Sequence, residues 1–389
     1  MSFVPKDKSK KRKIAIIAGS RGEYGYFQPI VREIEKRENL DYGFVLANMH
    51  MLDRFGSSAE EIQKDNLKIE ASIFNTFDGY NHLTMVKSLS VFMLQLPEIL
   101  HNMGADMVLL GGDRGEQLVG AIVGAHLYLP VAHIQAGELS GNIDGVSRHA
   151  ITKFSHIHFA SNQDAADRVL KMGEESHRIY NVGAPQLDDF TAGLITPQEE
   201  IYRKFNLNKD KPVILVLQHS ITEQFDQAEK QMEETMKAIK NFDAQILIIL
   251  NNSDAGSNFL RRVVNKNRNS STQTFSNVPR RDYGGLLNVA SVLVGNSSSG
   301  ILEAPSFKLP SVNIGDRQYG RLQGINVINV QHEAEEIIKA IKFAMSEEFK
   351  EKIKDCANPY GNGQSSKKIV DILENIEIDD KLLIKRLTY

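Results

Sequence analysis

The chain has 389 residues, 41% hydrophobic and 24% charged, which is typical of a soluble globular protein and, at about 150 residues per domain, predicts two or three domains. Its 46 basic residues nearly balance 49 acidic ones, which excludes a nucleic-acid-binding protein that works by charge alone. The single cysteine, Cys356, excludes an internal disulfide and a cysteine-rich zinc site.

The N-terminus and the apolar runs of the sequence indicate where in the cell the protein is found. The basic N-terminus, MSFVPKDKSKKRK, lacks the apolar stretch of a signal peptide. No apolar run approaches the roughly 18 residues that a membrane span needs. We therefore expect a cytoplasmic protein whose short lysine run is a solvated tail.

Short β-branched runs alternate with amphipathic stretches along almost the whole chain. Most runs are continuously apolar, which is typical of strands buried on both faces of a parallel sheet. The predicted strands are residues 13–18, 42–47, 106–110, 131–134, 157–160, 213–217, 245–250, 291–294 and 311–314. Helical patterns lie at residues 26–36, 82–103, 116–127, 224–240 and 364–376. This alternation predicts doubly wound α/β sheets with right-handed crossovers.

The alternation of strand and helix patterns stops at residues 183–211, which we interpret as a linker region. The sequence thus predicts an α/β protein of two Rossmann-like domains facing each other across a cleft. Residues 1–185 form the first domain, residues 186–363 form the second, and the C-terminal segment 364–389 packs on the first. Ligands of such sheets bind beyond the carboxyl ends of the strands, so the loops after strands are the candidate sites.

Two glycine turns follow strands in the first half. GSRGEYG, residues 19–25, lacks the dinucleotide fingerprint, but its backbone N–H groups and Arg21 could bind an anion. A tight turn with a solvated arginine is the alternative. LLGGDRGE, residues 109–116, places Asp113 at a strand end facing the cleft, where an ordinary helix cap is the alternative.

The densest polar stretch is residues 131–160, which holds Glu138, Asp144, Arg148 and four of the chain's 11 histidines. Asp144 and Arg148 are four residues apart and would share one helix face, where Arg148 would keep Asp144 ionised. The stretch has no H-x-x-x-H or H-E-x-x-H spacing, so acid–base chemistry by carboxylates and imidazoles is favoured over metal binding. Structural histidines beside a sheet account for at least one of the four.

Three loops after strands in the second half combine small polar residues. They are LQHSIT (217–222), LNNSDAGS (250–257) and VGNSSSGILEAP (294–305), and VNIGDRQYGR (312–321) adds Arg317 and Arg321. In the third loop, serine hydroxyls, backbone N–H groups and a helix N-terminus would together bind an anion, and Glu303 could accept from ribose hydroxyls. Serine caps are often purely structural. Three such loops on one rim nevertheless favour a nucleotide site.

These elements together resemble the hydrolysing UDP-N-acetylglucosamine 2-epimerases and their relatives that act on UDP-diacetylbacillosamine, which supply sialic and legionaminic acid synthesis. The resemblance runs from Arg21 to Arg321 and rests on GSRGEYG, GGDR, HIQAGELSGNID, SRHAITKFSHIH, HSIT, NNSDAGS, GNSSSG and GDRQYGR. It implies the two-domain glycosyltransferase-B fold. The UDP-binding set that it implies is Arg21, His219, Asn252, Asp254, Ser297, Ser298, Gly300, Glu303 and Arg317. The set that it implies around the sugar and its leaving phosphate is Asp113, Glu138, Asp144, Arg148 and His219.

The reaction implied by the resemblance is anti elimination of UDP across C1–C2 to 2-acetamidoglucal, followed by hydration to the free 2-epimeric sugar. Asp113 and Asp144 are the leading acid–base pair, with Glu138 next. The family often has a glutamate in HIEGGE where this chain has Gln135, so another carboxylate takes that role or the substrate differs. We expect UDP-N-acetylglucosamine as substrate, no cofactor, no metal, no membrane or nucleic-acid partner, and a homo-oligomer, either a dimer or a tetramer.

Four alternatives stay open. The first is the same reaction on UDP-N,N'-diacetylbacillosamine. The second is a non-hydrolysing epimerase, whose relatives carry a more compact HVEAGLRT segment. The third is a glycosyltransferase of the same fold, and the fourth, outside enzymes, is a nucleotide-sugar-binding sensor, which Gln135 favours.

Overall fold

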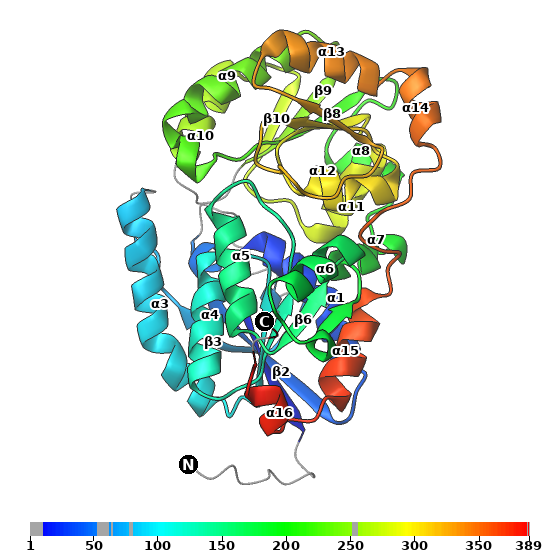
Figure 1. Ribbon diagram of the computed structural model, residues 1–389. Helices are drawn as coiled ribbons and strands as arrows, with labels where there is room; N and C mark the ends of the chain where they lie inside the picture. The colour runs from blue at the N-terminus through cyan, green and yellow to red at the C-terminus, as the bar shows by residue number, and fades with distance from the viewer. Residues whose placement is uncertain are drawn as a thin grey trace.

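The computed structural model describes residues 11–52, 62–63, 65–77, 81–250, 256–386 and 388, and every structural statement below refers to these. The chain forms two α/β domains, one above the other in Figure 1. One contains a seven-stranded sheet and the other a six-stranded sheet, and all the strand pairs are parallel. The predicted fold class is confirmed.

The first domain has the strand order β3-β2-β1-β4-β5-β6-β7. Its strands are β1 (Arg12–Ala18), β2 (Leu40–Ala47), β3 (Ile69–Ile73), β4 (Met107–Gly111), β5 (Val131–Ile134), β6 (Ile157–Ala160) and β7 (Ile179–Asn181). Its helices are α1 (Arg21–Ile34), α3 (His82–Asn102), α4 (Gly115–His126), α5 (Ile143–Phe154) and α6 (Gln163–Lys171). The central strands are apolar and buried on both faces, because helices cover both sides of the sheet.

The second domain has the strand order β10-β9-β8-β11-β12-β13. Its strands are β8 (Val213–Leu217), β9 (Gln245–Ile249), β10 (Thr272–Phe275), β11 (Val292–Gly295), β12 (Ser311–Ile314) and β13 (Val327–Val330). Its helices are α8 (Gln198–Lys204), α9 (Ala228–Ile239), α10 (Ser257–Asn267), α11 (Arg280–Val289), α12 (Ser299–Leu302), α13 (Ala334–Ala344) and α14 (Glu347–Ile353).

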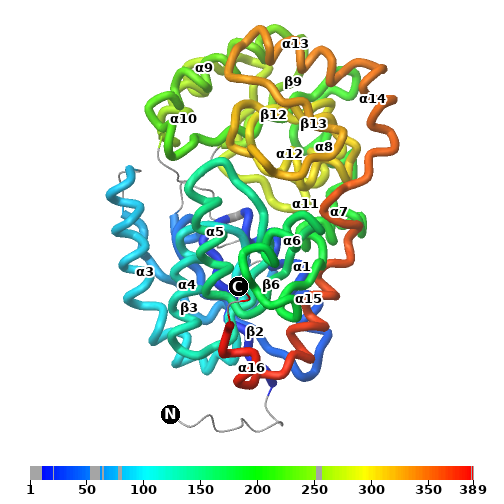
Figure 2. The backbone as a smooth tube through the Cα atoms, viewed as in Figure 1, coloured from blue at the N-terminus to red at the C-terminus, as the bar shows by residue number. Residues whose placement is uncertain are grey.

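The chain crosses between the domains twice, as Figure 2 shows. It first crosses near the short turn η4 (Pro185–Leu187) and α7 (Asp188–Thr191), and it returns after α14 to α15 (Ser365–Asn375) and α16 (Asp380–Leu383). Helix α15 packs on α1 and adds Ile369, Val370 and Leu373 to the core of the first domain. Arg12 donates to the carbonyls of Glu374 (3.1 Å) and Ile376 (2.9 Å) at the end of α15.

Helix α3 is the one helix of the described chain whose length and composition alone would suffice to cross a membrane, which the sequence analysis did not anticipate. Its buried residues recur every fourth position, at Ser88, Phe92, Leu96 and Leu100. The apolar ones lie in a core cluster with β1, β4 and α4. This face makes α3 a covering helix of the first sheet.

Candidate active site

A polar cleft lies between the two domains, at the carboxyl ends of both sheets. The first domain contributes the loops after β1, β4 and β5 and the start of α5, and the second contributes the loops after β8, β9, β10, β11 and β12. Of the predicted site residues, those that line the cleft are Asp113, Asp144, Arg148, His219, Ser297, Ser298, Glu303 and Arg317. Loops after strands thus form both walls, as this class of sheet predicts.

Asp113 and Arg148 form the centre of the wall that belongs to the first domain. Gly112, with φ +84°, turns the chain at the end of β4, and its carbonyl accepts a 2.7 Å hydrogen bond from Nε2 of His133. Asp113 follows and forms an ion pair with Arg148, which is 1% exposed on α5. Sequence spacing had placed Arg148 beside Asp144, whereas its guanidinium donates to Asp113, to Ser140 Oγ (3.5 Å) and to Gln135.

The charge state of Asp113 follows from this setting. Burial opposes ionisation, but Arg148 and the arginines at 321, 317 and 114 outweigh it and hold the pKa of Asp113 below its usual value. Asp113 is therefore a carboxylate at neutral pH, the form that can accept a proton.

Gln135 and Asp144 flank this pair. Gln135 follows β5 with φ +62°, and both its carbonyl (3.1 Å) and its side-chain Oε1 (3.4 Å) accept from Nη1 of Arg148. Asp144 lies in the first turn of α5 and accepts a 2.9 Å hydrogen bond from Nδ2 of Asn142. Carboxylates and a carboxamide thus lie on one wall of the cleft.

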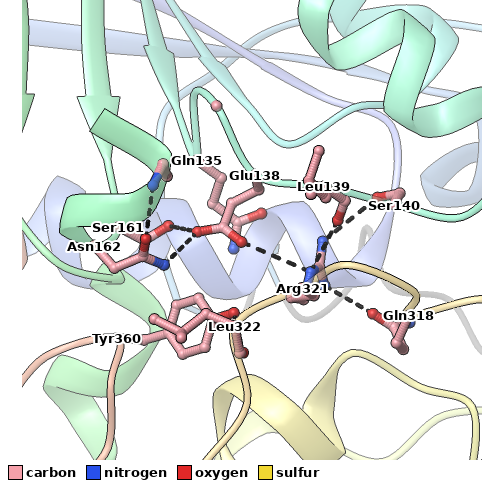
Figure 3. A network of polar contacts seen from close by, with 12 residues as sticks. Gln135, Glu138, Leu139, Ser140, Ser161, Asn162, Gln318, Arg321, Leu322 and Tyr360 are labelled. Atoms are coloured by element: carbon pink, nitrogen blue, oxygen red, sulfur yellow. Dashed lines mark hydrogen bonds and ion pairs between the residues drawn. The ribbon is translucent and has the colours of Figure 1, made fainter. Parts of the chain in front are cut away.

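Glu138 has a different place from the one predicted. It is 2% exposed and does not belong to the residues that line the cleft in the described structure. Figure 3 shows its carboxylate between two sets of partners. Ser161 Oγ and Asn162 Nδ2 donate to it at 2.8 Å, and Nε of Arg321, from the second domain, lies 3.7 Å away. These contacts give Glu138 an anchoring position between the domains.

Glu23 is a cleft residue that the sequence analysis missed. Its Oε2 accepts from the backbone N–H groups of Gly19 (2.5 Å) and Ser20 (3.0 Å) at the start of α1. Burial and the neighbouring carboxylate of Glu116 raise the pKa of Glu23 to about 8. The spacing Ser20-x-x-Glu23 is a capping-box signal that could have located this residue.

The wall of the second domain is organised by Asn296, which is fully buried after β11. Its Oδ1 accepts from the backbone N–H of His219 (2.7 Å), and its Nδ2 donates to the His219 carbonyl (2.9 Å). Its own carbonyl accepts from Arg317 (3.2 Å) and Gln318 (2.9 Å). One asparagine therefore ties together the loops after β8, β11 and β12.

Glu303 lies deeper on the same wall. Arg280 Nη1 pairs with one of its oxygens at 3.1 Å, and Ser299 Oγ donates to the other at 2.5 Å. Tyr283 hydrogen-bonds Ser299. Arg280 and Tyr283 are cleft residues of α11 that the sequence analysis did not single out.

Arg321 joins the two walls. Its Nε donates to the carbonyl of Leu139 (3.1 Å) in the first domain, and its Nη1 donates to Gln318 Oε1 (3.0 Å) in its own (Figure 3). Beside it, the backbone N–H of Gly141 donates to the carbonyl of Arg317 (3.0 Å). Residues 135–142, the acidic loop that carries Glu138 between β5 and α5, are thus held by the second domain.

Several expectations find no support in the cleft or lie outside the description. The side chain of Arg21, and Asn252 and Asp254, lie outside the described residues. Gly300 packs on β12, where a Cβ would lie 2.2 Å from Ser311 Oγ, and it is not a lining residue.

Three of the four histidines at residues 131–160, His133, His156 and His158, make structural contacts. None of the four lines the described part of the cleft. His133 holds the Gly112 turn, the ring of His156 accepts from the Val131 N–H (3.0 Å), and that of His158 contacts Glu174 (3.0 Å). Burial lowers the pKa of His133 to about 3 and that of His158 to about 4. The interpretation of this cluster as imidazole acid–base groups is not supported by these positions.

A metal centre is not apparent within the described ranges. They contain no group of three or more histidine, cysteine, aspartate or glutamate side chains that could hold a metal ion.

Two parallel α/β sheets with a polar, arginine- and serine-lined cleft at their carboxyl ends define a glycosyltransferase-B-type protein with a site suited to an anionic nucleotide ligand. The family model described as UDP-N-acetylglucosamine 2-epimerase matches residues 32–374. The chain belongs to this family.

Curated relatives and solved structures agree with this assignment. The chain is 32% identical to a UDP-N,N'-diacetylbacillosamine 2-epimerase (hydrolyzing) of Legionella pneumophila, over 96% of this chain and 98% of the relative. It is 30% identical to a UDP-N-acetylglucosamine 2-epimerase of Neisseria meningitidis serogroup B, over 86% and 88%. The crystal structure of a UDP-GlcNAc 2-epimerase from Neisseria meningitidis bound to UDP-GlcNAc has the same fold, with TM-score 0.79, 18% identity and coverage of 93% and 99%.

Proposed function

We propose that this enzyme is a hydrolysing 2-epimerase that binds a UDP-linked 2-acetamido sugar and releases UDP and the free 2-epimeric sugar. The observation that carries the proposal is the pairing of the two walls. On the wall of the first domain, an ionised Asp113 forms an ion pair with the buried Arg148. On the wall of the second domain, arginines, serine hydroxyls and backbone N–H groups form a set suited to an anion.

The first chemical step is an elimination. The C1–O bond to the diphosphate breaks, and its electron pair leaves with UDP. Oxocarbenium character at C1 makes the C2 proton removable, the proton passes to a carboxylate, and the C2–H electron pair forms the C1=C2 bond. Asp113 is the first candidate for the acceptor because its arginine neighbours keep it ionised.

The second step is a hydration. The hydroxyl of water adds to C1. A proton adds to C2 from the ring face opposite to the one that lost the first proton, which inverts C2 and gives the free epimeric sugar. Asp144, a second carboxylate that lines this wall, is the candidate for activating the water. Arg317 and the loop at Ser297–Ser299 stabilise the charge that grows on the leaving diphosphate.

Two substrates are candidates. UDP-N,N'-diacetylbacillosamine is favoured by two curated relatives, the UDP-N,N'-diacetylbacillosamine 2-epimerase of Legionella pneumophila and a GDP/UDP-N,N'-diacetylbacillosamine 2-epimerase of Campylobacter jejuni. They align with 96% and 95% of this chain. UDP-N-acetylglucosamine, the first expectation from the sequence, is favoured by the family description and by the Neisseria relative.

The test is proton NMR of the purified protein with each UDP-sugar in deuterated water. Free sugar of inverted C2 configuration, deuterated at C2 and formed with one equivalent of UDP, is the expected result for one of the two. A UDP-linked epimer would identify a non-hydrolysing enzyme instead. UDP binding without conversion of either sugar would refute the catalytic proposal and favour a sensor.

A further inference from the structure

Gln135 combines a strained backbone with a buried side chain at the cleft wall. It is a non-glycine residue in the left-handed region, with φ +62°, and is only 2% exposed. Such backbone strain is maintained where the surrounding structure requires one side-chain position. Its neighbours on this wall include Asp113 and Arg148.

Arg148 decides which end of the Gln135 carboxamide is left without a partner. A guanidinium carries only donors, so the atom of Gln135 that meets Nη1 at 3.4 Å must be the carbonyl oxygen Oε1. The NH2 end is therefore the free end. Within the described part of the chain, Nε2 is buried and has no hydrogen-bond partner. Buried donors are nearly always paired in the working state of a protein, so a bound ligand is the natural acceptor.

Asp113 is the carboxylate that pairs with the Arg148 guanidinium. Arg148 is 1% exposed, one of its terminal nitrogens pairs with Asp113, and the other serves Gln135. A carboxylate at position 135 would be a second anion on the same buried guanidinium. Because Gln135 is neutral, Asp113 has no such competitor.

We propose that Gln135 contacts the substrate, its NH2 group donating a hydrogen bond to an oxygen of the bound amino sugar, while its lack of charge leaves Arg148 to Asp113 alone. This inference rests on the proposed function, since it names a sugar contact of the same site. It makes the glutamine a functional part of the wall rather than a lost carboxylate.

The other titratable and charged groups near Asp113 are the same whether position 135 is glutamine or glutamate. Arg114 follows it in the same loop, Tyr26 comes from α1, His133 from β5, and Arg317 and Arg321 from the second domain. Asp144 lies on the same wall. A glutamate at 135 would change the balance at Arg148 without altering any of these, so its effect on Asp113 can be isolated.

The experiment compares Gln135→Glu and Gln135→Met with the wild-type chain. Gln135→Met keeps length and removes the donor without adding charge. The titration of Asp113 is followed by carboxyl NMR of aspartate-labelled protein without substrate, and Asp113→Asn assigns the signal. We expect Gln135→Glu to raise the pKa of Asp113 by about one unit. Gln135→Met should leave the pKa near its wild-type value.

Kinetics and binding test the sugar contact. We expect Gln135→Met to lower kcat/KM by about 10- to 100-fold, with UDP affinity and thermal stability near wild type. In Gln135→Glu the acid limb of the pH–rate profile should move to higher pH. An unchanged Asp113 titration in Gln135→Glu would overturn the charge argument, and a Gln135→Met enzyme within twofold of wild type would overturn the sugar contact.

Failure of the proposed function gives a different pattern. A wild-type protein that converts neither UDP-sugar would refute the epimerase reaction. The affinity ratio of UDP-sugar to UDP is then measurable without turnover. A ratio that is lower in Gln135→Met than in wild type still supports the sugar contact, and an equal ratio refutes it.

Discussion

Replacement of Asp113 by asparagine removes the proposed proton acceptor while keeping the shape of the side chain and an oxygen that can accept from Arg148. The arginines around Asp113 keep it ionised, so nearly the whole wild-type population carries the base at neutral pH. Asp113→Asn therefore loses the full contribution of a general base, about 10²- to 10⁴-fold. At about 1.4 kcal/mol per tenfold, this is about 3–5 kcal/mol of transition-state stabilisation.

UDP binding should respond in the opposite direction. Asp113 is an anion that faces arginines of both domains, so its neutralisation leaves the cleft more positive and UDP affinity equal or higher. Activity is measured as UDP release and affinity by calorimetry. Asp164→Asn is the matched control, because Asp164 pairs with Arg168 on the exposed surface of α6. An Asp113→Asn enzyme within tenfold of wild type would refute the assignment of Asp113 as base.

With a pKa of about 8, Glu23 is protonated at pH 7 and becomes charged above pH 8. Because the new negative charge repels the anionic UDP, UDP affinity should fall by about fivefold towards pH 9. Calorimetry should show this fall in wild type and not in Glu23→Gln. Arg321→Met removes the link to Leu139 and Glu138, and we expect kcat/KM to fall by about 30-fold or more; an unaltered kcat/KM would show that the acidic loop is positioned without it. His133 and His158 are held neutral by burial, with pKa values of about 3 and 4 against 6.5 in the unfolded chain. Stability is thus complete above pH 6.5 and lost as pH falls towards 4, by about 2 kcal/mol per histidine at pH 5, which urea unfolding at pH 7 and pH 5 measures.

The sequence predicted the interiors of both sheets and missed their edges. All nine predicted strands are present, and β3, β7, β10 and β13 are the four that were missed. Each of these lies at a sheet edge. Edge strands are only partly buried, as in β10, where every residue is of intermediate exposure. Continuous apolar runs are therefore the signature of inner strands, and edge strands leave no such signal.

The same limit applies to the site. Asp113, His219 and the serine loop were found because each follows an inner strand that was recognised. Arg280 was missed because it begins α11 after the unrecognised edge strand β10. Composition was a weaker guide at residues 131–160: the histidines there suggested acid–base groups, whereas the rings of His133, His156 and His158 bond to backbone groups and to Glu174. Burial, which spacing does not encode, separates the two cases.

Glu138 shows why a site between two domains cannot be assembled from motifs alone. It lies in the correct segment and has the correct chemistry, but its carboxylate faces Ser161, Asn162 and Arg321 (Figure 3). Arg321 lies 183 positions further along the chain, in the loop that also carries Arg317. A ligand that binds Arg317 therefore acts on the same loop that anchors Glu138 and Leu139. Asp144 lies in the first turn of the helix that follows these residues. We therefore expect a ligand bound at Arg317 to influence the position of this carboxylate through the loop that joins the two domains.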